Sequence, residues 1–144
     1  MAANTSPIYS LAGQVATDSG TSMSQLVLNA ANDYTGIDAD VTLVFTADPT
    51  NGSYIQRLRF KAGGTNTATV ARIYLNNGSD HTTATNNAFY GEVSLPATTA
   101  IATAATIDVD YPMSFALPAG FRVYVGYATA TAAGWCCIGI GGDY

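Results

Sequence analysis

Charged residues are scarce in this sequence. Its 144 residues include five lysines and arginines and ten aspartates and glutamates, so charged residues make up 10% and the net charge is −5. A typical soluble domain has roughly 25% charged residues. So few cations argue against a protein that neutralises DNA phosphates, and so few charges exclude a coiled coil or a charge-driven disordered chain. No apolar run reaches the roughly 18 residues of a membrane-spanning helix. We therefore expect neither direct nucleic-acid binding nor a membrane partner.

Cysteine and histidine are almost absent, which leaves little material for metal sites or redox chemistry. The two cysteines, Cys136 and Cys137, are adjacent, and the one histidine is His81. Zinc sites use four ligands from spaced Cys and His pairs, and a disulfide between neighbours needs a strained ring. We interpret the cysteines as small apolar residues of a buried strand, with a vicinal redox pair as the alternative. No metal ion or cofactor is predicted.

The sequence also lacks the motifs of common catalytic sites. It has no G-x-S-x-G elbow and no Walker loop. Asp80 and His81 are adjacent, but no serine nucleophile context accompanies them. Two pairs of carboxylates separated by one residue leave a calcium site open as an alternative. They are Asp38 with Asp40 and Asp108 with Asp110. We predict no catalytic residues, and an enzyme is the least favoured function.

The first part of the chain has no clear strand or helix pattern. It begins MAANTSPIYS, which has neither the positive charge nor the apolar stretch of a secretory signal, so we expect synthesis and folding in a cytoplasm. Residues 1–38 contain polar clusters typical of loops. We predict that they form an arm over the domain or over a neighbour, with minor strands at 8–11 and 25–28. Residues 39–144 are predicted to form one domain.

The sequence is instead rich in small and hydroxylated residues, with 24 alanines, 19 threonines, 14 glycines and 9 asparagines. They surround runs of β-branched and aromatic residues that alternate with turn signals such as 48–52, Asp-Pro-Thr-Asn-Gly. The predicted strands cover residues 41–45, 54–62, 67–75, 89–95, 107–117, 121–128 and 135–140. With one or two weaker strands, they predict an all-β fold, an antiparallel β-sandwich of about eight strands that is jelly-roll-like. An immunoglobulin-like sandwich is the alternative, but its spaced Cys…Trp…Cys pattern is missing.

Two segments of this domain are less regular. Residues 97–105 are rich in alanine and threonine and fit either a weak helical turn or a long loop. Pro112 cannot donate to a strand ladder, so it marks its run as an edge strand or a bulge.

Alternation along residues 54–62 assigns side chains to two faces. One face is predicted to hold Gln56, Leu58, Phe60 and Ala62, and the other Ile55, Arg57, Arg59 and Lys61. A hairpin between this run and 67–75, across Gly63 and Gly64, would bring Arg72 to the basic face. Four of the five basic residues would then form a contact surface for an acidic partner or an anion. The alternative is a solvated face whose cations pair with Asp108 and Asp110 across the sheet.

Four stretches in the second half of the chain carry a resemblance to known proteins. They are 68–79 (ATVARIYLNNGS), 95–99 (LPATT), 116–120 (ALPAG) and 133–144, which begins AGW and ends GGDY. In these stretches the chain resembles small virion structural proteins of tailed phages, in particular capsid decoration or cement proteins. Residues 1–38 lie outside the resemblance.

The resemblance implies a non-enzymatic protein on the capsid surface of the virion, synthesised in the host cytoplasm. Such a protein binds the outer surface of the shell and stabilises it by bridging neighbouring capsid subunits. The implied partners are the major capsid protein and further copies of the chain, in a trimer or dimer. We expect contacts from the arm and from the basic residues. These residues are Arg57, Arg59, Lys61 and Arg72.

The alternative function is a tail-fibre or receptor-binding sandwich that recognises carbohydrate. The sequence has nine tyrosines and one tryptophan, and exposed aromatic rings can stack on sugars. Trp135, Tyr124 and Tyr127 are the candidate platform, although Trp135 stands in an apolar run that is typical of a core strand.

Overall fold

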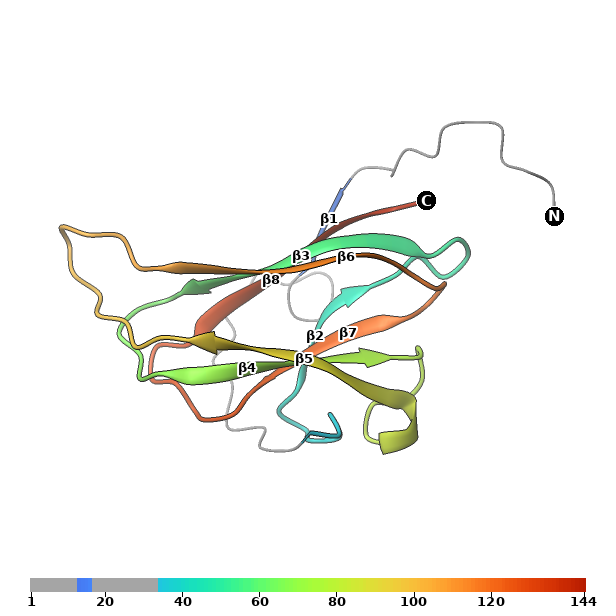
Figure 1. Ribbon diagram of the computed structural model, residues 1–144, viewed down its shortest axis with the longest axis horizontal. Helices are drawn as coiled ribbons and strands as arrows, with labels where there is room; N and C mark the ends of the chain where they lie inside the picture. Colours follow the sequence, from blue (N-terminus) through green and yellow to red (C-terminus); the bar gives the residue numbers. More distant parts are fainter. Residues whose placement is uncertain (1–12, 17–33) are drawn as a thin grey trace.

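The protein is an all-β sandwich of two antiparallel four-stranded sheets (Figure 1). This computed structural model describes residues 13–16 and 34–144. The strands are β1 (Gly13–Ala16), β2 (Thr42–Thr46), β3 (Ser53–Ala62), β4 (Thr69–Asn76), β5 (Asn87–Leu95), β6 (Asp108–Leu117), β7 (Arg122–Tyr127) and β8 (Trp135–Asp143). The only helical element in the described part is a short 3-10 turn at Ala84–Asn86, and no described helix could cross a membrane.

The strand order is that of a jelly roll. The first sheet runs β1-β8-β3-β6 and the second runs β2-β7-β4-β5. Each neighbouring pair is antiparallel, and the chain passes repeatedly from one sheet to the other, as two interlocked Greek keys require. The predicted fold class is therefore confirmed, and the immunoglobulin-like alternative, with its different strand order, is not observed.

The core lies between the two sheets. Alternating residues of each strand point inward, and the main cluster includes Leu58, Phe60, Ile73, Val123, Val125 and Trp135, each fully buried. Each large apolar side chain removed from water contributes roughly 1.5–3 kcal/mol, so this cluster supplies most of the driving force for folding. Cys137 is buried in the same cluster while Cys136 is half-buried, and both are free thiols. The interpretation of the cysteines as strand residues is confirmed.

The predicted hairpin between residues 54–62 and 67–75 is wrong. β3 pairs with β6 and β8 in the first sheet, whereas β4 pairs with β5 and β7 in the second. The connecting residues 63–68 cross from one sheet to the other. Glycine and polar residues suit a crossing connection as well as a hairpin, so the local sequence does not distinguish the two. The consequence is that Arg72 lies in a different sheet from the other predicted contact residues.

A β-bulge in β3 reverses the predicted faces of the residues before it. The pairing register shifts between Ile55 and Arg57, against both β6 and β8. Because a bulge inserts one extra residue, the alternation changes phase there. Ile55 is buried and Gln56 is exposed, the reverse of the prediction, while Leu58, Phe60 and Ala62 face the core as expected.

Aromatic residues of two edge strands close one side of the sandwich. β5 and β6 stand at the ends of their sheets, so the predicted edge position of Pro112 is confirmed. The Tyr90 ring lies 5.3 Å from the Phe115 ring and 6.3 Å from the Tyr111 ring, between centroids. Gly91 makes room for this contact, because a Cβ there would lie 2.3 Å from the Tyr111 hydroxyl.

The predicted arm of residues 1–38 is described only in part. Within it, Gly13–Ala16 form β1 and pair with the Gly139–Gly142 stretch of β8. Residues 34–38 follow the outer side of the second sheet, where Thr35 accepts a hydrogen bond from Asn87. The predicted minor strands at 8–11 and 25–28 lie outside the described residues. In the later part of the chain, residues 97–105 are a loop rather than a helical turn.

Candidate interaction surfaces

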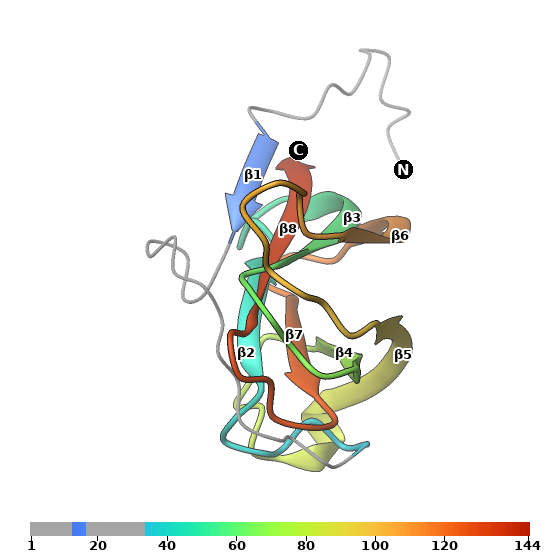
Figure 2. The ribbon, with the colours of Figure 1, turned by 90° about the vertical axis from the view of Figure 1, so that its left-hand side faces the viewer.

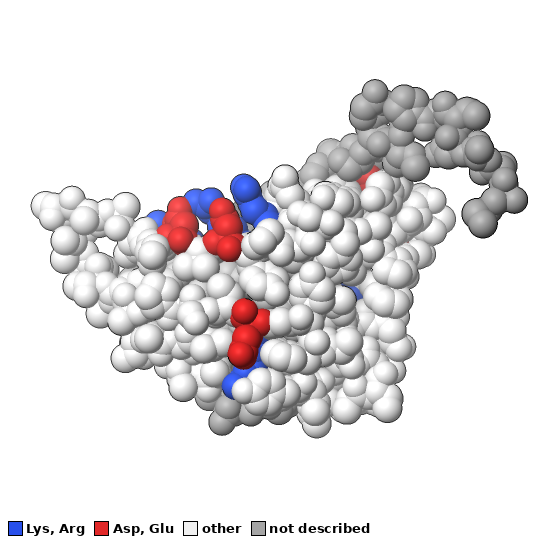
Figure 3. Space-filling model, in the orientation of Figure 1, with Lys and Arg blue, Asp and Glu red and all other residues white. Residues whose placement is uncertain are grey.

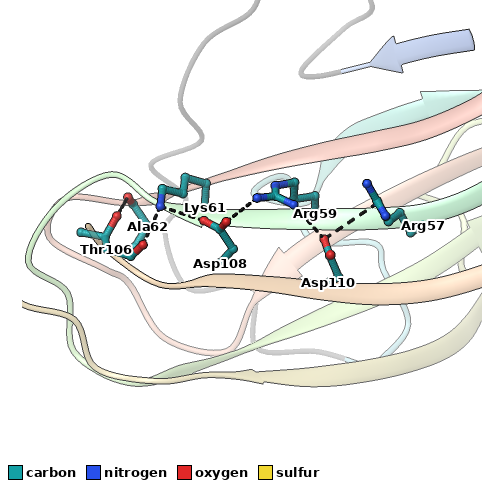
Figure 4. Close-up of polar contacts among 7 residues, drawn as sticks. All are labelled: Arg57, Arg59, Lys61, Ala62, Thr106, Asp108 and Asp110. Carbon is teal, nitrogen blue, oxygen red and sulfur yellow. Dashed lines mark hydrogen bonds and ion pairs between the residues drawn. The ribbon is translucent and has the colours of Figure 1, made fainter. Parts of the chain in front are cut away.

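Three of the four predicted contact residues share the outer face of the first sheet. Arg57, Arg59 and Lys61 alternate along β3, with 40%, 36% and 41% of their side-chain surfaces exposed (Figure 4). Their spacing follows from the two-residue period of a strand, which turns every second side chain to one side. The sequence prediction that these three cations lie together is confirmed.

Two carboxylates of β6 lie beside these cations. Arg59 contacts both Asp108 and Asp110, and the Lys61 ammonium lies 2.7 Å from Asp108 (Figure 4). Arg57 is 4.0 Å from Asp110. The hydrogen bond from Lys61, and then the charges of Arg59 and Lys61, lower the pKa of Asp108. The predicted pairing across the sheet is confirmed. We call this face the β3–β6 charge ladder, and it has three cations and two anions: Arg57, Arg59, Lys61, Asp108 and Asp110.

Arg72 does not belong to this surface. It is buried in β4 on the outer side of the second sheet, with its guanidinium 4.1 Å from the ring centroid of Tyr34. Its Nη2 donates to the Tyr34 hydroxyl at 3.1 Å, and its Nε lies 3.8 Å from Glu92. The prediction of one four-residue basic surface is therefore wrong, because the crossing connection after β3 places β4 in the opposite sheet.

The predicted sugar-stacking platform is also wrong. Trp135 and Tyr127 are fully buried, and Tyr124 is 7% exposed. Both fully buried residues belong to the main core cluster, where the Tyr127 hydroxyl donates to the backbone carbonyl of Trp135. His81 stacks on Tyr124 with ring centroids 4.8 Å apart.

The remaining candidates for a catalytic or calcium site make hydrogen bonds within their own loops. The Asp80 carboxylate accepts hydrogen bonds from the backbone and side chain of Thr82, and the backbone bond is the main reason for its lowered pKa. Asp38 accepts a hydrogen bond from the backbone of Asp40. Over residues 13–16 and 34–144, no three His, Cys, Asp or Glu side chains gather in a group that could hold a metal ion.

One end of the sandwich is formed by loops without charged residues. Three connections meet there, the β3–β4 loop 63–68, the β5–β6 loop 96–107 and the β7–β8 loop 128–134 (Figure 2). No Asp, Glu, Lys or Arg occurs in any of the three. We call this surface the charge-free end. At the left of Figure 3 it forms an uncharged projection beyond the charged side chains of the β3–β6 charge ladder.

Asn66 ties the three loops of the charge-free end together. Its backbone exchanges two hydrogen bonds with Thr98 of the longest loop. Asn66 as a whole is 4% exposed. Its side-chain amide donates to the Gly134 carbonyl at 2.9 Å and accepts from the Ala133 backbone amide at 2.8 Å. The Thr98 hydroxyl also donates to the Gly64 carbonyl. The network fixes three loops that are far apart in sequence.

A groove of about 440 Å³ lies at the same end, beside the longest loop. It is bordered by the ends of β4, β5 and β7 and their adjoining residues, which include Thr69, Val70, Ser94, Leu95, Pro96 and Ala128. No charged residue lines the groove. Ile101 and Ile107 of the neighbouring loop segment are 56% and 47% exposed.

The sequence analysis did not predict an interaction surface at this end, because its candidates were charged, catalytic or metal-binding residues. The signal was present as three long stretches without a charged residue, 62–71, 93–107 and 123–142. Their meeting at one end depends on the jelly-roll connections, which the local pattern does not contain. In comparisons with known proteins, no family model, curated protein or solved structure matches the chain.

Proposed function

We propose that the protein is a non-enzymatic phage capsid decoration protein. It binds the outer surface of the shell and stabilises it by bridging neighbouring copies of the major capsid protein. It acts on the virion, as a closed oligomer, after synthesis in the host cytoplasm. Many small contacts per particle, rather than one tight contact, would supply the stabilisation.

The observation that carries the proposal is the strand order. Residues 68–144 resemble virion decoration proteins, and the resemblance implies a jelly roll, which is the order of the two sheets. Jelly rolls also occur in lectins and enzymes, so the fold supports the proposal without deciding between functions. Capsid binding is proposed among these functions because of the sequence resemblance.

The β3–β6 charge ladder is the proposed contact with the shell. Arg57, Arg59 and Lys61 are partly exposed and outnumber the carboxylates that face them. Surface ion pairs are individually weak, so an acidic partner can replace Asp108 or Asp110 at small cost. Arg72, which the sequence placed in this contact, is left out because it is buried.

Shell binding tests the proposal. The variant Arg57→Glu with Arg59→Glu is mixed with purified shells of the phage that encodes the chain, and bound protein is measured after sedimentation. We expect binding to fall sharply, with the fold unchanged by circular dichroism. Arg122→Glu, a cation on β7 outside the ladder, is the matched control and should bind normally.

A second measurement tests the proposal independently of the contact surface. Mass spectrometry of purified virions gives the copy number relative to the major capsid protein. A comparable copy number is expected. Absence of the chain from virions would overturn the proposal, and a few copies per particle would favour a tail component.

Carbohydrate recognition by a tail-fibre protein remains the second candidate, on different residues from those predicted. Tyr34 and Phe89, on the outer side of the second sheet, are 57% and 41% exposed. Their rings meet edge to face at 5.3 Å, which is an exposed aromatic surface of the kind that stacks on sugars. Binding to a glycan array that is lost in Tyr34→Ala would favour this candidate.

A further inference from the structure

We infer that the charge-free end is a self-association surface, in which the β5–β6 loop of one copy occupies the groove of a second copy. The inference rests on the proposed function in one respect, because a bridging decoration protein is expected to form a closed oligomer. The inference goes beyond the proposed function because it names the surface that associates and the loop that occupies the groove. Its test uses the isolated protein, so that it can fail without the shell-binding proposal failing.

The charge distribution favours a second copy as the occupant. Two copies each carry a net charge of −5, so they repel one another over most approaches. The three loops of the charge-free end contribute no charge, and neither does the groove beside them. Two such ends can therefore approach without placing like charges opposite each other, and no charged group has to be desolvated.

The β5–β6 loop has the shape and composition of an inserted segment. It projects from the sandwich (Figure 1). Ile101, near the middle of the loop sequence, is 56% exposed. A large apolar side chain on an uncharged projection gains from burial against another apolar surface. The occupant is thus a segment of this chain itself.

The loop is also fixed before association. Thr98 is tied to Asn66 and Gly64 near the start of the loop, and the Ala100 amide donates to the Thr65 hydroxyl. At the other end Thr106 donates to the Ala62 carbonyl. Because these bonds already order the loop, little conformational entropy is lost when it enters a partner.

The groove is placed so that both copies can exchange loops. Pro96 lines the groove and also begins the loop, so each copy presents the two features side by side. Its apolar wall, formed by accessible residues such as Val70, Pro96 and Ala128, suits an isoleucine, and its volume is about 440 Å³. Mutual insertion gives a two-fold dimer, and insertion into the next copy gives a closed ring.

The test measures the size of the isolated full chain by sedimentation velocity from micromolar to near-millimolar concentration. The wild-type chain is expected to form a discrete oligomer. Ile101→Lys, at the loop, and Ser94→Glu, on the exposed rim of the groove, should each weaken association by about tenfold or more, the scale of a central interface residue. Ile37→Lys, an exposed isoleucine 40% accessible away from this end, is the control and should associate like the wild type.

Combining the two substitutions makes the test specific. In the variant with both Ile101→Lys and Ser94→Glu, the new charges are opposite and should restore part of the lost association. A wild-type monomer at the highest concentration would overturn the inference, as would normal association of either single variant. A monomer that still binds shells would overturn this inference and the proposed closed oligomer but not shell binding, whereas an oligomer that ignores shells would overturn shell binding alone.

Discussion

At the two ends of the sandwich, Asn66 and the turn residues Asp48 and Asn77 make different kinds of side-chain hydrogen bond. At the charge-free end, Asn66 joins loops from three parts of the chain, with partners 32 to 68 residues away. At the opposite end, polar side chains cap the turns in which they stand. Asp48 accepts from the amides of Thr50 and Asn51, and Asn77 accepts from the amide of Ser79.

The contrast shows which part of the surface depends on the assembled sheets. Local caps form as soon as a turn forms, and they tolerate water around them. The side-chain bonds by which the buried Asn66 bridges the loops form only when the sheets have assembled. The charge-free end is therefore the part of the surface that depends most on the complete fold.

The largest expected effect is at Asn66. Asn66→Ala removes the side-chain acceptor of the half-buried Ala133 amide and one of the two donors to the Gly134 carbonyl, so the free energy of unfolding should fall by about 1–3 kcal/mol. Asn77→Ala, which removes an exposed cap at the opposite end, should cost less than about 1 kcal/mol. Urea unfolding measures both. Equal losses would contradict the contrast between the two ends.

Alkaline pH should lower the free energy of unfolding through two buried groups, the Cys137 thiol and the Tyr127 phenol. Burial raises the pKa of Cys137 well above 9.0, and burial and the nearby thiols raise that of Tyr127 well above 10.0. In the unfolded chain these groups lose their protons at the ordinary values, so the stabilisation is complete below pH 9 and is lost as pH rises. The slope should be about 1.4 kcal/mol per pH unit for each group.

Thermal unfolding as a function of pH measures this slope. Cys137→Ala removes one of the two groups, so its stability should fall less steeply between pH 9 and 10 than that of the wild type. An unchanged slope would show that the buried Cys137 thiol does not control alkaline unfolding.

A smaller effect is expected at the opposite end. Asp48→Ala removes the acceptor for two turn amides and should lower the free energy of unfolding by about 1 kcal/mol. Asp48→Asn keeps an oxygen acceptor in place and should recover most of the loss. Urea unfolding of both variants checks this, and a loss as large as that of Asn66→Ala would remove the distinction between local and bridging bonds.

The smallest effect is expected in the β3–β6 charge ladder. Its hydrogen bond from Lys61 lowers the pKa of Asp108, so the pairing is present above pH 3.8 and is lost as pH falls below it. Because the carboxylate is exposed, Asp108→Asn should change the stability less than Asp48→Ala does, and added salt should reduce even that change. A strong salt dependence of wild-type stability that disappears in the variant would contradict this ranking.

Individual residues show how far the sequence predicted the fold. The runs 54–62 and 121–128 became β3 and β7 because their alternation and flanking turns encode a strand directly. Ile55 and Gln56 were assigned to the wrong faces because a bulge depends on the partner strands. The cations of β3 were correctly grouped, since neighbours on one strand need no tertiary information, but Arg72 was misplaced.

Backbone preference and the two-residue period of side chains were enough to predict the strands, the turns and most of the inward-facing residues from the sequence. The sequence also determined the low charge, which the three loops of the charge-free end share. Three features depend on the assembled fold: which strands pair, the departure of Arg72 from the basic face, and the meeting of three uncharged loops around Asn66. Polar connections of similar composition serve both hairpins and crossings, and the burial of the whole core selects between them.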